Sequence, residues 1–514
     1  MLIGHVSDEN HSAVCGAVVE FRQADRSWTL TATPSGALYG DLPEGDYEAI
    51  LACPGYGSKR TRLTLANGRP HLFRLLADGF LGYMWPGWCR TGETAEYRVH
   101  SNHGFRLDLF RYGWSKEFIT SFGWCDEHGD RAMMQITPDH DYSGTGAAWN
   151  HTGYTLEFQK HSLVAPDRSG LYYLHATTLD GRFTNFPWIV SPRTPKADIC
   201  VLASTITWNA YNRFGGRSNY FSQDGLTPEP VVNARQDLGR YTHPDTWPYQ
   251  DTAAPLSFDR PSPSVVIPEA DEITSPIRGR MASALAPGEW RLLGWLDREH
   301  FAYDLYSETE LHFDRVPLES YRVLVLNTHP EYWSPEMYHR VKHWVHHDGG
   351  RLMYLAGCGM YAEVQFPDNQ TMLCRREGEH SLRGESEAHL LGLAYTHSGF
   401  QSGAPYRVID ASDSVFADTG LATGDLFGHG SLHERCPGGA SAHELDKISP
   451  DSPGHLRHLA KGTNPDDSGA DLVSYDTESG GRVFSAGSLC WTLSLPIDDG
   501  ISAVTANALR GMLE

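Results

Sequence analysis

Two short peptides of this sequence concentrate the side chains that hold metal ions and move protons. The first is 329–333, His-Pro-Glu-Tyr-Trp, and the second is 357–361, Gly-Cys-Gly-Met-Tyr. Phenol and carboxylate oxygens suit hard cations, whereas a thiol that is paired with a histidine is typical of cysteine nucleophiles. A structural interpretation is also open, in which Tyr332 and His329 only form hydrogen bonds with the backbone in a buried polar corner.

Apolar runs precede both peptides. Residues 198–203, 321–326 and 351–356 have the pattern of strands that are buried on both faces. Between the last two, Ser334 and Pro335 predict the start of a helix, which is expected to run to about His347 before Asp-Gly-Gly stops it. A strand, a helix and a strand at this spacing form a right-handed parallel crossover. Because ligands bind beyond the carboxyl ends of parallel strands, we expect the two peptides to lie side by side.

The chain before these runs reads as β-structure. Alternating stretches at 17–21 and 47–51, separated by Pro- and Gly-rich turns, predict a β-sandwich over residues 1–77 that resembles the carboxypeptidase regulatory-like (transthyretin-like) module. Residues 78–195 predict a second, Ig-like β-sandwich, and a Pro-rich stretch at 190–195 ends it. The predicted fold class is therefore multidomain, with two N-terminal β-sandwiches followed by an α/β domain over 196–514 that has a mostly parallel sheet.

Composition excludes several classes of function. With 42 basic and 64 acidic residues the formal net charge is -22, which is unsuited to nucleic acid because phosphate binding needs clustered Lys and Arg. No signal peptide or apolar span of membrane length is visible, so no membrane partner is expected. The nine cysteines are scattered without a CxxC pair, which indicates reduced thiols in a cytoplasmic protein.

An ordered set of motifs resembles the N,N-dimethylformamidase large-subunit family. The set comprises Trp-Asn-Ala-Tyr-Asn at 208–212 with Gly-Gly at 215–216, His-Pro-Glu-Tyr-Trp-Ser at 329–334, Gly-Gly-Arg-Leu at 349–352 and Gly-Gly-Arg-Val-Phe at 480–484. Residues 439–446 resemble that family's acidic loop. The resemblance covers about 190–514. It implies hydrolysis of a linear carboxamide to a carboxylic acid and an amine, at one iron ion per chain, expected to be ferric. By motif, the metal ligands would be Tyr332, Tyr361 and Glu444.

The remaining site residues follow from the same comparison. A base must take a proton from the attacking water and pass it to the leaving nitrogen, and the candidates are His329, Glu331 and His443. Glu331 is equally a candidate for holding a ligand in place. Around the second tyrosine this chain has Cys358 and Ala362 where the family pattern has Asn and Trp, so the amide is expected to differ from dimethylformamide. The substrate-lining candidates are Trp333, Cys358, Ala362, Asn209, Tyr211 and Asn212. For the three residues of segment 209–212, roles in a turn and in packing are the alternative.

Two other functions stay open. The Gly-Cys-Gly turn at Cys358 resembles the nucleophile elbow of class I glutamine amidotransferases, whose fold the α/β domain is expected to share. His429, His433 or His443 would then supply the base, although that family's His-x-Glu ending is missing. The third interpretation is a non-catalytic protein that binds carbohydrate or a partner, because residues 78–195 are rich in tryptophan. For the amidase, we expect a small amide substrate and a homo-oligomer; a separate small subunit is implied by the resemblance, unless the N-terminal sandwich replaces it.

Overall fold

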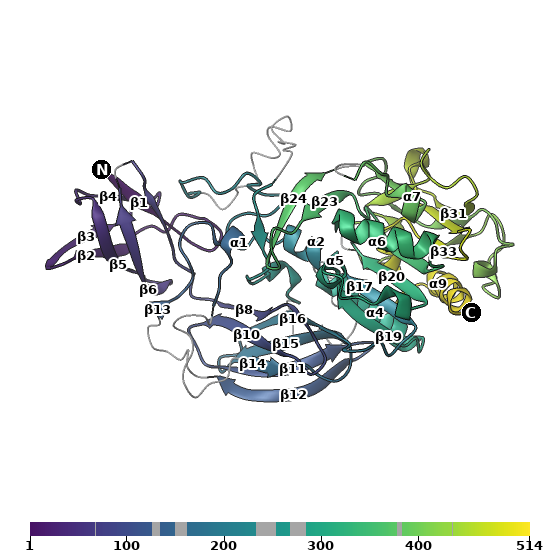
Figure 1. The fold of residues 1–514 in the computed structure, drawn as a ribbon, viewed down its shortest axis with the longest axis horizontal. Coiled ribbons are helices and arrows are strands. Elements are labelled where there is room, and N and C mark those ends of the chain that lie inside the picture. The colour runs from purple at the N-terminus through teal and green to yellow at the C-terminus, as the bar shows by residue number, and fades with distance from the viewer. Residues whose placement is uncertain are drawn as a thin grey trace.

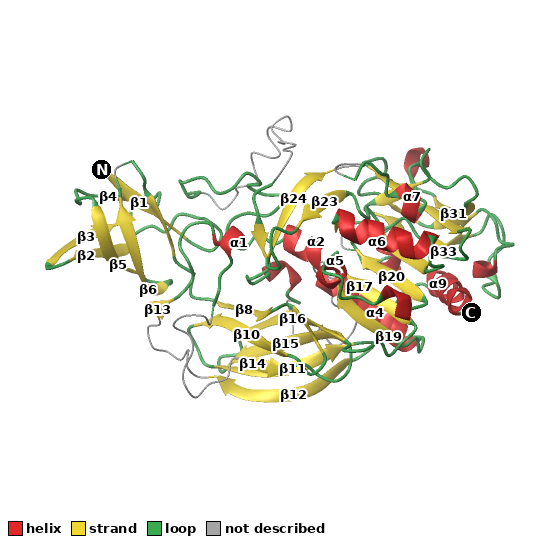
Figure 2. Cartoon of the chain, viewed as in Figure 1, coloured by secondary structure: helices red, strands yellow, loops and turns green. Residues whose placement is uncertain are grey.

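The computed structural model describes residues 1–66, 68–125, 134–149, 162–232, 253–267, 284–377, 383–433 and 435–514. In Figure 1 the chain starts in a purple β-module on the left, passes through a blue β-module below, and ends in a green and yellow module on the right. Strands dominate the first two modules, and most of the longer helices lie in the third (Figure 2). The protein is therefore β-rich and built from several modules.

Two small sheets form the N-terminal module. One has the order β4-β1-β7, and the other has the order β13-β6-β5-β2-β3. Their bounds are β1 Leu2–Ser7, β2 Val18–Gln23, β3 Arg26–Thr31, β4 Ala37–Tyr39, β5 Gly45–Cys53, β6 Gly57–Leu65, β7 His71–Arg74 and β13 Met134–Gln135. Alternate side chains of β2, Val19 and Phe21, are fully buried in a core that is separate from those of the other modules. Strand β13 comes from beyond residue 77, so a later segment of the chain completes this sheet.

The second module also pairs two sheets, with the orders β14-β10-β8 and β12-β11-β15-β16-β9. The strands are β8 Phe80–Trp85, β9 Trp88–Arg90, β10 Thr94–Ser101, β11 Phe105–Tyr112, β12 Lys116–Cys125, β14 Ser162–Val164, β15 Gly170–Thr178 and β16 Phe183–Ser191. Trp188, on β16, is buried in the core of this sandwich. Short helix α1 (Tyr142–Thr145) lies between the N-terminal module and the third module in Figure 1, above the second sandwich.

A nine-stranded sheet organises the third module, in the order β19-β17-β20-β22-β33-β32-β31-β27-β28. The strands are β17 Ile199–Ala203, β19 Tyr303–Ser307, β20 Val323–Thr328, β22 Arg351–Ala356, β27 Tyr406–Val408, β28 Leu426–Phe427, β31 Arg457–Gly462, β32 Asp471–Asp476 and β33 Arg482–Ser485. Neighbours from β19 to β33 are parallel, and neighbours from β33 to β28 are antiparallel. The sheet is thus half parallel and not mostly parallel, because the strands after β22 return as a meander.

Helices cover both faces of this sheet. One face packs against α4 (Ala286–Arg298), α8 (Cys490–Ser494) and α9 (Asp499–Leu513), and the other packs against α2 (Thr205–Ala210), α5 (Glu308–His312) and α6 (Pro335–His346). The prediction of α6 is confirmed, since Ser334 accepts a hydrogen bond from the backbone of Met337 and the helix ends before Gly349, whose φ is +74°. Strand β20 precedes α6 in the chain and β22 follows it. The two strands pair in parallel, as the predicted crossover requires.

Smaller elements surround the end of the sheet where β20 and β22 stop. A four-stranded sheet has the order β18-β24-β23-β21, with β18 Leu256–Ser257, β21 Tyr332–Trp333, β23 Ala362–Gln365 and β24 Thr371–Glu377. Short pieces complete the chain: α7 Ala388–Leu391, β25 Ala394–Thr396, β26 Gly403–Ala404, β29 Ser441–Ala442 and β30 Leu445–Lys447. Over the described part of the chain, the helices are too short or too polar to span a lipid bilayer.

Candidate active site

The two peptides singled out by their residue types meet beyond β20 and β22. The backbone N–H of Met360 donates to the carbonyl of Pro330 at 2.8 Å, and that of Ala362 donates to the carbonyl of Glu331 at 2.9 Å. Tyr332 pairs with Ala362 in the short parallel ladder of β21 and β23. The expectation that these loops lie side by side is therefore confirmed.

A third loop, between β29 and β30, comes back to the same place. The position of Gly357 allows this, because a Cβ there would lie 2.4 Å from the carbonyl oxygen of Glu444. Asp446 holds the two loops together, since it accepts hydrogen bonds from the Cys358 backbone at 2.9 Å and from the Tyr354 hydroxyl at 2.6 Å. Glu444 is thereby placed at the carboxyl end of β22, far in sequence from the other site residues.

His329 is the centre of a buried charge cluster. Its Nε2 lies 2.7 Å from Oε2 of Glu444 and 3.3 Å from Oε2 of Glu331. Glu331 is held in turn by the hydroxyl of Tyr211, at 3.0 Å, and by that of Tyr220. Burial opposes the charged form of His329, but Glu444 and Glu331 outweigh it and raise its pKa to about 9. Burial also opposes ionisation of Glu444, yet His329 keeps its pKa below the usual value.

The cluster carries an excess of buried acid groups. His329, Glu331 and Glu444 are 1%, 5% and 8% exposed, and one imidazolium balances one of the two carboxylates. Asp446 adds a third carboxyl group, whose pKa burial raises to about 7. Three carboxyl groups beside one imidazole form an acidic set of oxygen donors, which is a kind of set that binds a cation. Carboxylate and phenol oxygens are donors for a hard, highly charged ion, and iron(III) fits them.

The two tyrosines predicted as ligands belong to the two peptides that carry Glu331 and Cys358. Tyr332 is fully buried, with its ring edge-on to that of Tyr220 at a centroid distance of 6.4 Å. Tyr361 is half-buried, with its ring edge-on to that of Tyr395 at 5.3 Å. The ring of Tyr220 is also 4.4 Å from that of Tyr211. Tyr332 thus belongs to a row of rings with Tyr220 and Tyr211, and Tyr361 belongs to a separate pair with Tyr395.

Cys358 lies inside the same cluster. Its thiol, a ring nitrogen of His329 and a carboxylate oxygen of Glu331 all lie within 4.8 Å of one another. The backbone φ of Cys358 is +54°, a left-handed conformation that residues other than glycine rarely adopt. Burial raises the pKa of the Cys358 thiol well above its usual value, and the carboxylates of Glu444 and Glu331 raise it further. The thiol is therefore protonated at neutral pH. The histidine beside it is His329, which was not among those proposed as its base.

The third base candidate, His443, faces the acid group from the other side. Its Nε2 lies 3.9 Å from Oε1 of Glu444, and its ring stacks on that of His433 at 4.5 Å. Burial lowers its pKa, so its neutral form dominates at neutral pH. Of the three base candidates, His329 and Glu331 contact each other, and His443 contacts the cluster through Glu444.

Most of the other substrate-lining candidates lie apart from the acid cluster. Asn209 accepts a hydrogen bond from Arg260 at 3.1 Å, and Asn212 donates to the carbonyl of Pro261 at 3.0 Å. Both line a cavity of about 370 Å³ together with Trp85, Trp88 and Trp208, and the residues of the acid cluster do not border it. The indole of Trp333 is fully buried and donates to Glu308 at 2.9 Å. From the segment 208–212, Tyr211 is the residue that reaches the cluster.

The sequence assigned no role to Tyr220, Asp446 or Cys436, and His433 was considered only as a base for Cys358. Tyr220 belongs to no recognisable motif, and only the fold brings its hydroxyl to Glu331. Asp446 lies within the acidic loop that the motif comparison had marked. His433 and Cys436 have the His-x-x-Cys spacing of a metal-binding turn, a signal that a search for CxxC pairs passes over.

Comparison with known proteins places this arrangement in a family. The family model described as N,N-dimethylformamidase beta subunit-like, C-terminal, matches residues 106–505. The N,N-dimethylformamidase beta subunits of Paracoccus aminophilus and an Alcaligenes species are 26% and 27% identical over 286 residues. Each alignment covers 44% of this chain and 37% of the relative, so the chain matches little more than a third of the length of these relatives.

Among solved structures, a DUF3823 family protein from Bacteroides ovatus is 9% identical, with coverage of 36% of this chain and 97% of that chain. Its TM-score of 0.14 is too low to support an argument about fold. The match of the family model extends over most of the chain and includes all three loops that meet at the acid cluster. This chain therefore belongs to the N,N-dimethylformamidase beta subunit-like family.

Proposed function

We propose that this protein hydrolyses a linear carboxamide to a carboxylic acid and an amine, at a mononuclear iron site held by Tyr332, Tyr361 and Glu444. The observation that carries the proposal is the buried, acid-rich cluster at the carboxyl ends of β20 and β22, within a chain of this family. A catalytic site is expected at that edge of the sheet, where the loops of parallel strands converge. Near-complete burial of His329, Glu331 and Glu444 keeps bulk water from competing for their protons.

Ferric iron, when bound, supplies a Lewis acid that polarises the amide carbonyl and lowers the pKa of the attacking water. The protein's own groups then manage the protons. In this proposal Glu331, fixed by two phenol hydroxyls, accepts the proton of water at a carboxylate oxygen. His329 holds a proton at Nε2 between two carboxylates and delivers it to the leaving nitrogen, because amines leave poorly without one.

A single substitution tests the proposal. Glu444→Ala is compared with Glu319→Ala, a change at an exposed glutamate that should alter stability by at most about 0.5 kcal/mol. Both proteins and the wild type are assayed for iron content and for amine released from N,N-dimethylformamide and from a series of larger N-substituted amides, and turnover is compared on the amide that the wild type hydrolyses fastest. The account expects folded Glu444→Ala protein with little iron and no amine release, and unchanged Glu319→Ala protein. Normal iron and turnover in Glu444→Ala would overturn it and move the third ligand elsewhere, with Glu331 the next candidate.

The amide and the assembly are part of the same proposal. Cys358 and Ala362 are smaller than the Asn and Trp expected from the family pattern, which favours an amide larger than dimethylformamide. The relatives are named beta subunits, and this supports a separate small subunit as a partner.

The half-parallel sheet with helices on both faces supports a likeness of the third module to class I glutamine amidotransferases.

A cysteine-nucleophile hydrolase is the second candidate, and one observation favours it. The left-handed backbone at Cys358 and the closeness of its thiol to His329 and Glu331 resemble a nucleophile with its base and orienting acid. The raised pKa of the thiol opposes this role, because a nucleophilic cysteine needs its thiolate. The iron-dependent mechanism is therefore the better supported of the two.

A further inference from the structure

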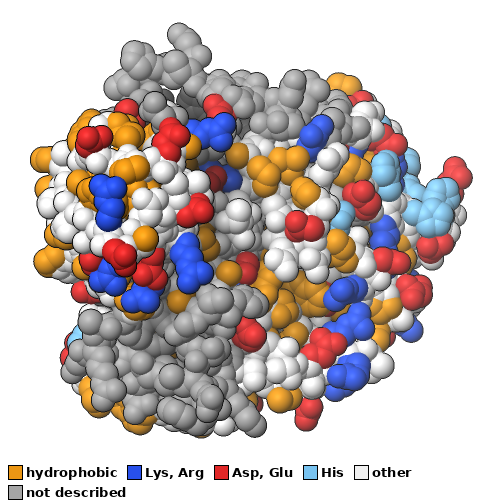
Figure 3. Space-filling view, turned by 60° about the vertical axis from the view of Figure 1, so that its left-hand side comes forward, with side chains coloured by type: hydrophobic (Ala, Val, Ile, Leu, Met, Phe, Trp, Pro, Cys, Tyr) orange, Lys and Arg blue, Asp and Glu red, His pale blue; other side chains and the backbone are white. Residues whose placement is uncertain are grey.

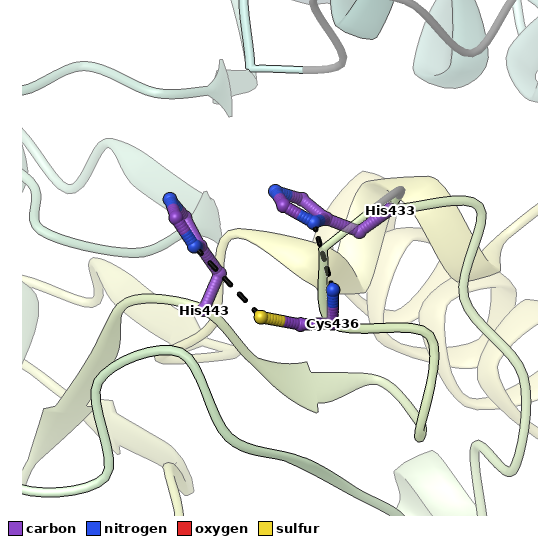
Figure 4. Close-up of side chains that lie close together, drawn as sticks. All are labelled: His433, Cys436 and His443. Atoms are coloured by element: carbon purple, nitrogen blue, oxygen red, sulfur yellow. Dashed lines mark hydrogen bonds between the residues drawn. The ribbon is translucent and has the colours of Figure 1, made fainter.

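A second cluster of metal-binding side chains lies beside the acid cluster. His433, Cys436 and His443 each offer a ligand atom, and these atoms lie within 4.8 Å of one another. Figure 4 shows the three side chains converging, with the thiol of Cys436 4.0 Å from Nδ1 of His443. All three residues are buried, at 7%, 3% and 8% exposure. They come from the connection between β28 and β30, which has little regular secondary structure.

Local hydrogen bonds shape the first half of the cluster. Nδ1 of His433 accepts from the backbone N–H of Arg435 at 3.1 Å and from that of Cys436 at 3.3 Å. This turn brings the Cys436 thiol back towards the ring of His433, and the ring of His443 then stacks on His433. The His-x-x-Cys segment and the later histidine are thus gathered by the fold, although six residues separate Cys436 from His443.

The chemistry of these donors differs from that of the acid cluster. Two imidazoles and a thiol form a borderline-to-soft set, whereas the neighbouring site offers carboxylates and phenols. Zinc takes this kind of donor set, and three protein ligands leave one coordination position for water. Binding would release the thiol proton to solvent, because the thiolate is the form that ligates.

We propose that His433, Cys436 and His443 bind one zinc ion that ties down the connection carrying Glu444. This inference does not depend on the hydrolytic proposal. A metal-bound histidine commonly turns its second nitrogen towards a carboxylate, and Nε2 of His443 faces Oε1 of Glu444 at 3.9 Å. The zinc thereby fixes His443, and through it Glu444, whose other oxygen contacts His329. His443 is then a positioning residue and not the general base.

Cobalt spectroscopy tests this proposal on the full chain. Metal-free protein is titrated with Co²⁺, which gives a thiolate-to-cobalt charge-transfer band only where a cysteine ligates. We expect the band in the wild type and in Cys358→Ser, and its loss in Cys436→Ser. Cys358→Ser is the matched control, because that thiol belongs to the neighbouring cluster. His343 of α6 is exposed, and a histidine that binds Co²⁺ without a cysteine adds no such band.

Two further measurements keep the result decisive if Cys436→Ser folds poorly. Protein isolated from cells should contain one equivalent of zinc, counted separately from iron, and adding Zn²⁺ to metal-free wild type should raise its Tm. Absence of the band from the wild type, no rise in Tm with Zn²⁺, or a band that survives in Cys436→Ser would overturn the proposal. A result for iron in the same samples bears on the acid cluster alone.

Discussion

The side chain of Cys358 shows how the surroundings of one residue decide between two chemistries. Its spacing to His329 and Glu331 suits a nucleophile, but buried carboxylates surround it on more than one side. Those carboxylates favour a bound cation and disfavour a second anion, so they stabilise the thiol over the thiolate. The same charges that fit the proposed iron site therefore make Cys358 a poor nucleophile.

Removal of the Cys358 thiol is therefore expected to have a mild effect on turnover. Cys358→Ser and Cys358→Asn should both keep measurable amide hydrolysis, within about tenfold of the wild type, which corresponds to about 1.4 kcal/mol in the barrier. The ratio of kcat/KM between small and large amides should change, since the proposal places this side chain at the border of the substrate pocket. Complete loss of turnover in Cys358→Ser, with metal content unchanged, would instead identify the thiol as the nucleophile.

At the scale of elements, the acidic loop depends on close backbone packing against the end of β22. A Cβ at Gly357 would lie 2.4 Å from the Glu444 carbonyl and 2.6 Å from the Leu489 nitrogen, both backbone atoms that cannot swing away. We predict that Gly357→Ala destabilises the fold by about 1–3 kcal/mol. It should also displace Glu444 and lower kcat.

The matched control is Gly454→Ala, where the added methyl group meets open space. Urea denaturation gives the free energy of unfolding for both variants, and amine release gives kcat. Equal stability and equal kcat for the two variants would show that the loop tolerates displacement, contrary to this account.

A second element-scale feature joins the N-terminal sandwich to the segment after β13. The carboxylate of Asp139 lies 2.7 Å from Nζ of Lys59 and 3.0 Å from Nε2 of His71, and it accepts a hydrogen bond from the Arg74 backbone at 3.0 Å. Burial opposes its ionisation, but Lys59 and His71 outweigh this and hold its pKa well below the usual value. Burial lowers the pKa of the Lys59 ammonium, because the one carboxylate of Asp139 offsets only part of the cost of burying that charge.

The sign of the pH effect follows from this shift. A carboxyl group with a lowered pKa in the fold stabilises the protein above its unfolded pKa of about 3.9 and loses that contribution as the pH falls below it. We predict that the free energy of unfolding decreases below about pH 4 and that Asp139→Asn removes part of this decrease. At neutral pH the variant should be less stable by about 3–5 kcal/mol, since Lys59 keeps a buried charge. Asp25→Asn, at an exposed turn position, should match the wild type at neutral pH and below pH 4. An unchanged pH profile in Asp139→Asn would contradict the prediction.

Local patterns in the sequence predict part of this architecture. The crossover through β20, α6 and β22 could be predicted because apolar runs, the Ser334 cap and the Gly349 stop act within a few residues. The antiparallel half of the sheet could not, since strands such as β31 alternate weakly and β31 pairs with β27 across the long segment 409–456. Tyr220 escaped for the same reason, because its link to Glu331 spans 111 residues.

At the scale of the whole molecule, the modules share structure that supports the site. The ring of Tyr112, in the second sandwich, lies 4.8 Å from that of Trp290 on α4, and the Trp290 indole donates to Gly113 at 2.7 Å. These residues belong to one continuous core that includes the sheet of the third module. The second sandwich is therefore part of the scaffold behind β17 and β20.

The N-terminal sandwich is joined to the segment that follows α2. Arg74 donates to the carbonyl of Gly215 at 2.6 Å, and the backbone N–H of Gly215 donates to Glu9 at 2.7 Å. Gly215 and Gly216 have φ of +101° and +97°, and a Cβ at Gly216 would lie 2.4 Å from that of His11. This glycine pair of the family motif thus forms part of the contact between modules.

On the face of Figure 3, acidic and basic side chains are interspersed over the N-terminal module, as on an ordinary hydrated surface.

The central claim is that the phenol oxygen of Tyr332 holds iron at the carboxyl ends of β20 and β22. The most direct measurement is the visible absorption spectrum of purified wild type and Tyr332→Phe, taken together with iron content and circular dichroism. The account predicts a coloured wild type, with a phenolate-to-iron charge-transfer band and about one iron per chain, and a folded, colourless Tyr332→Phe protein that lacks iron. Tyr332→Phe protein with the colour and iron of the wild type, or a wild type that releases amine at full rate without iron, would contradict it.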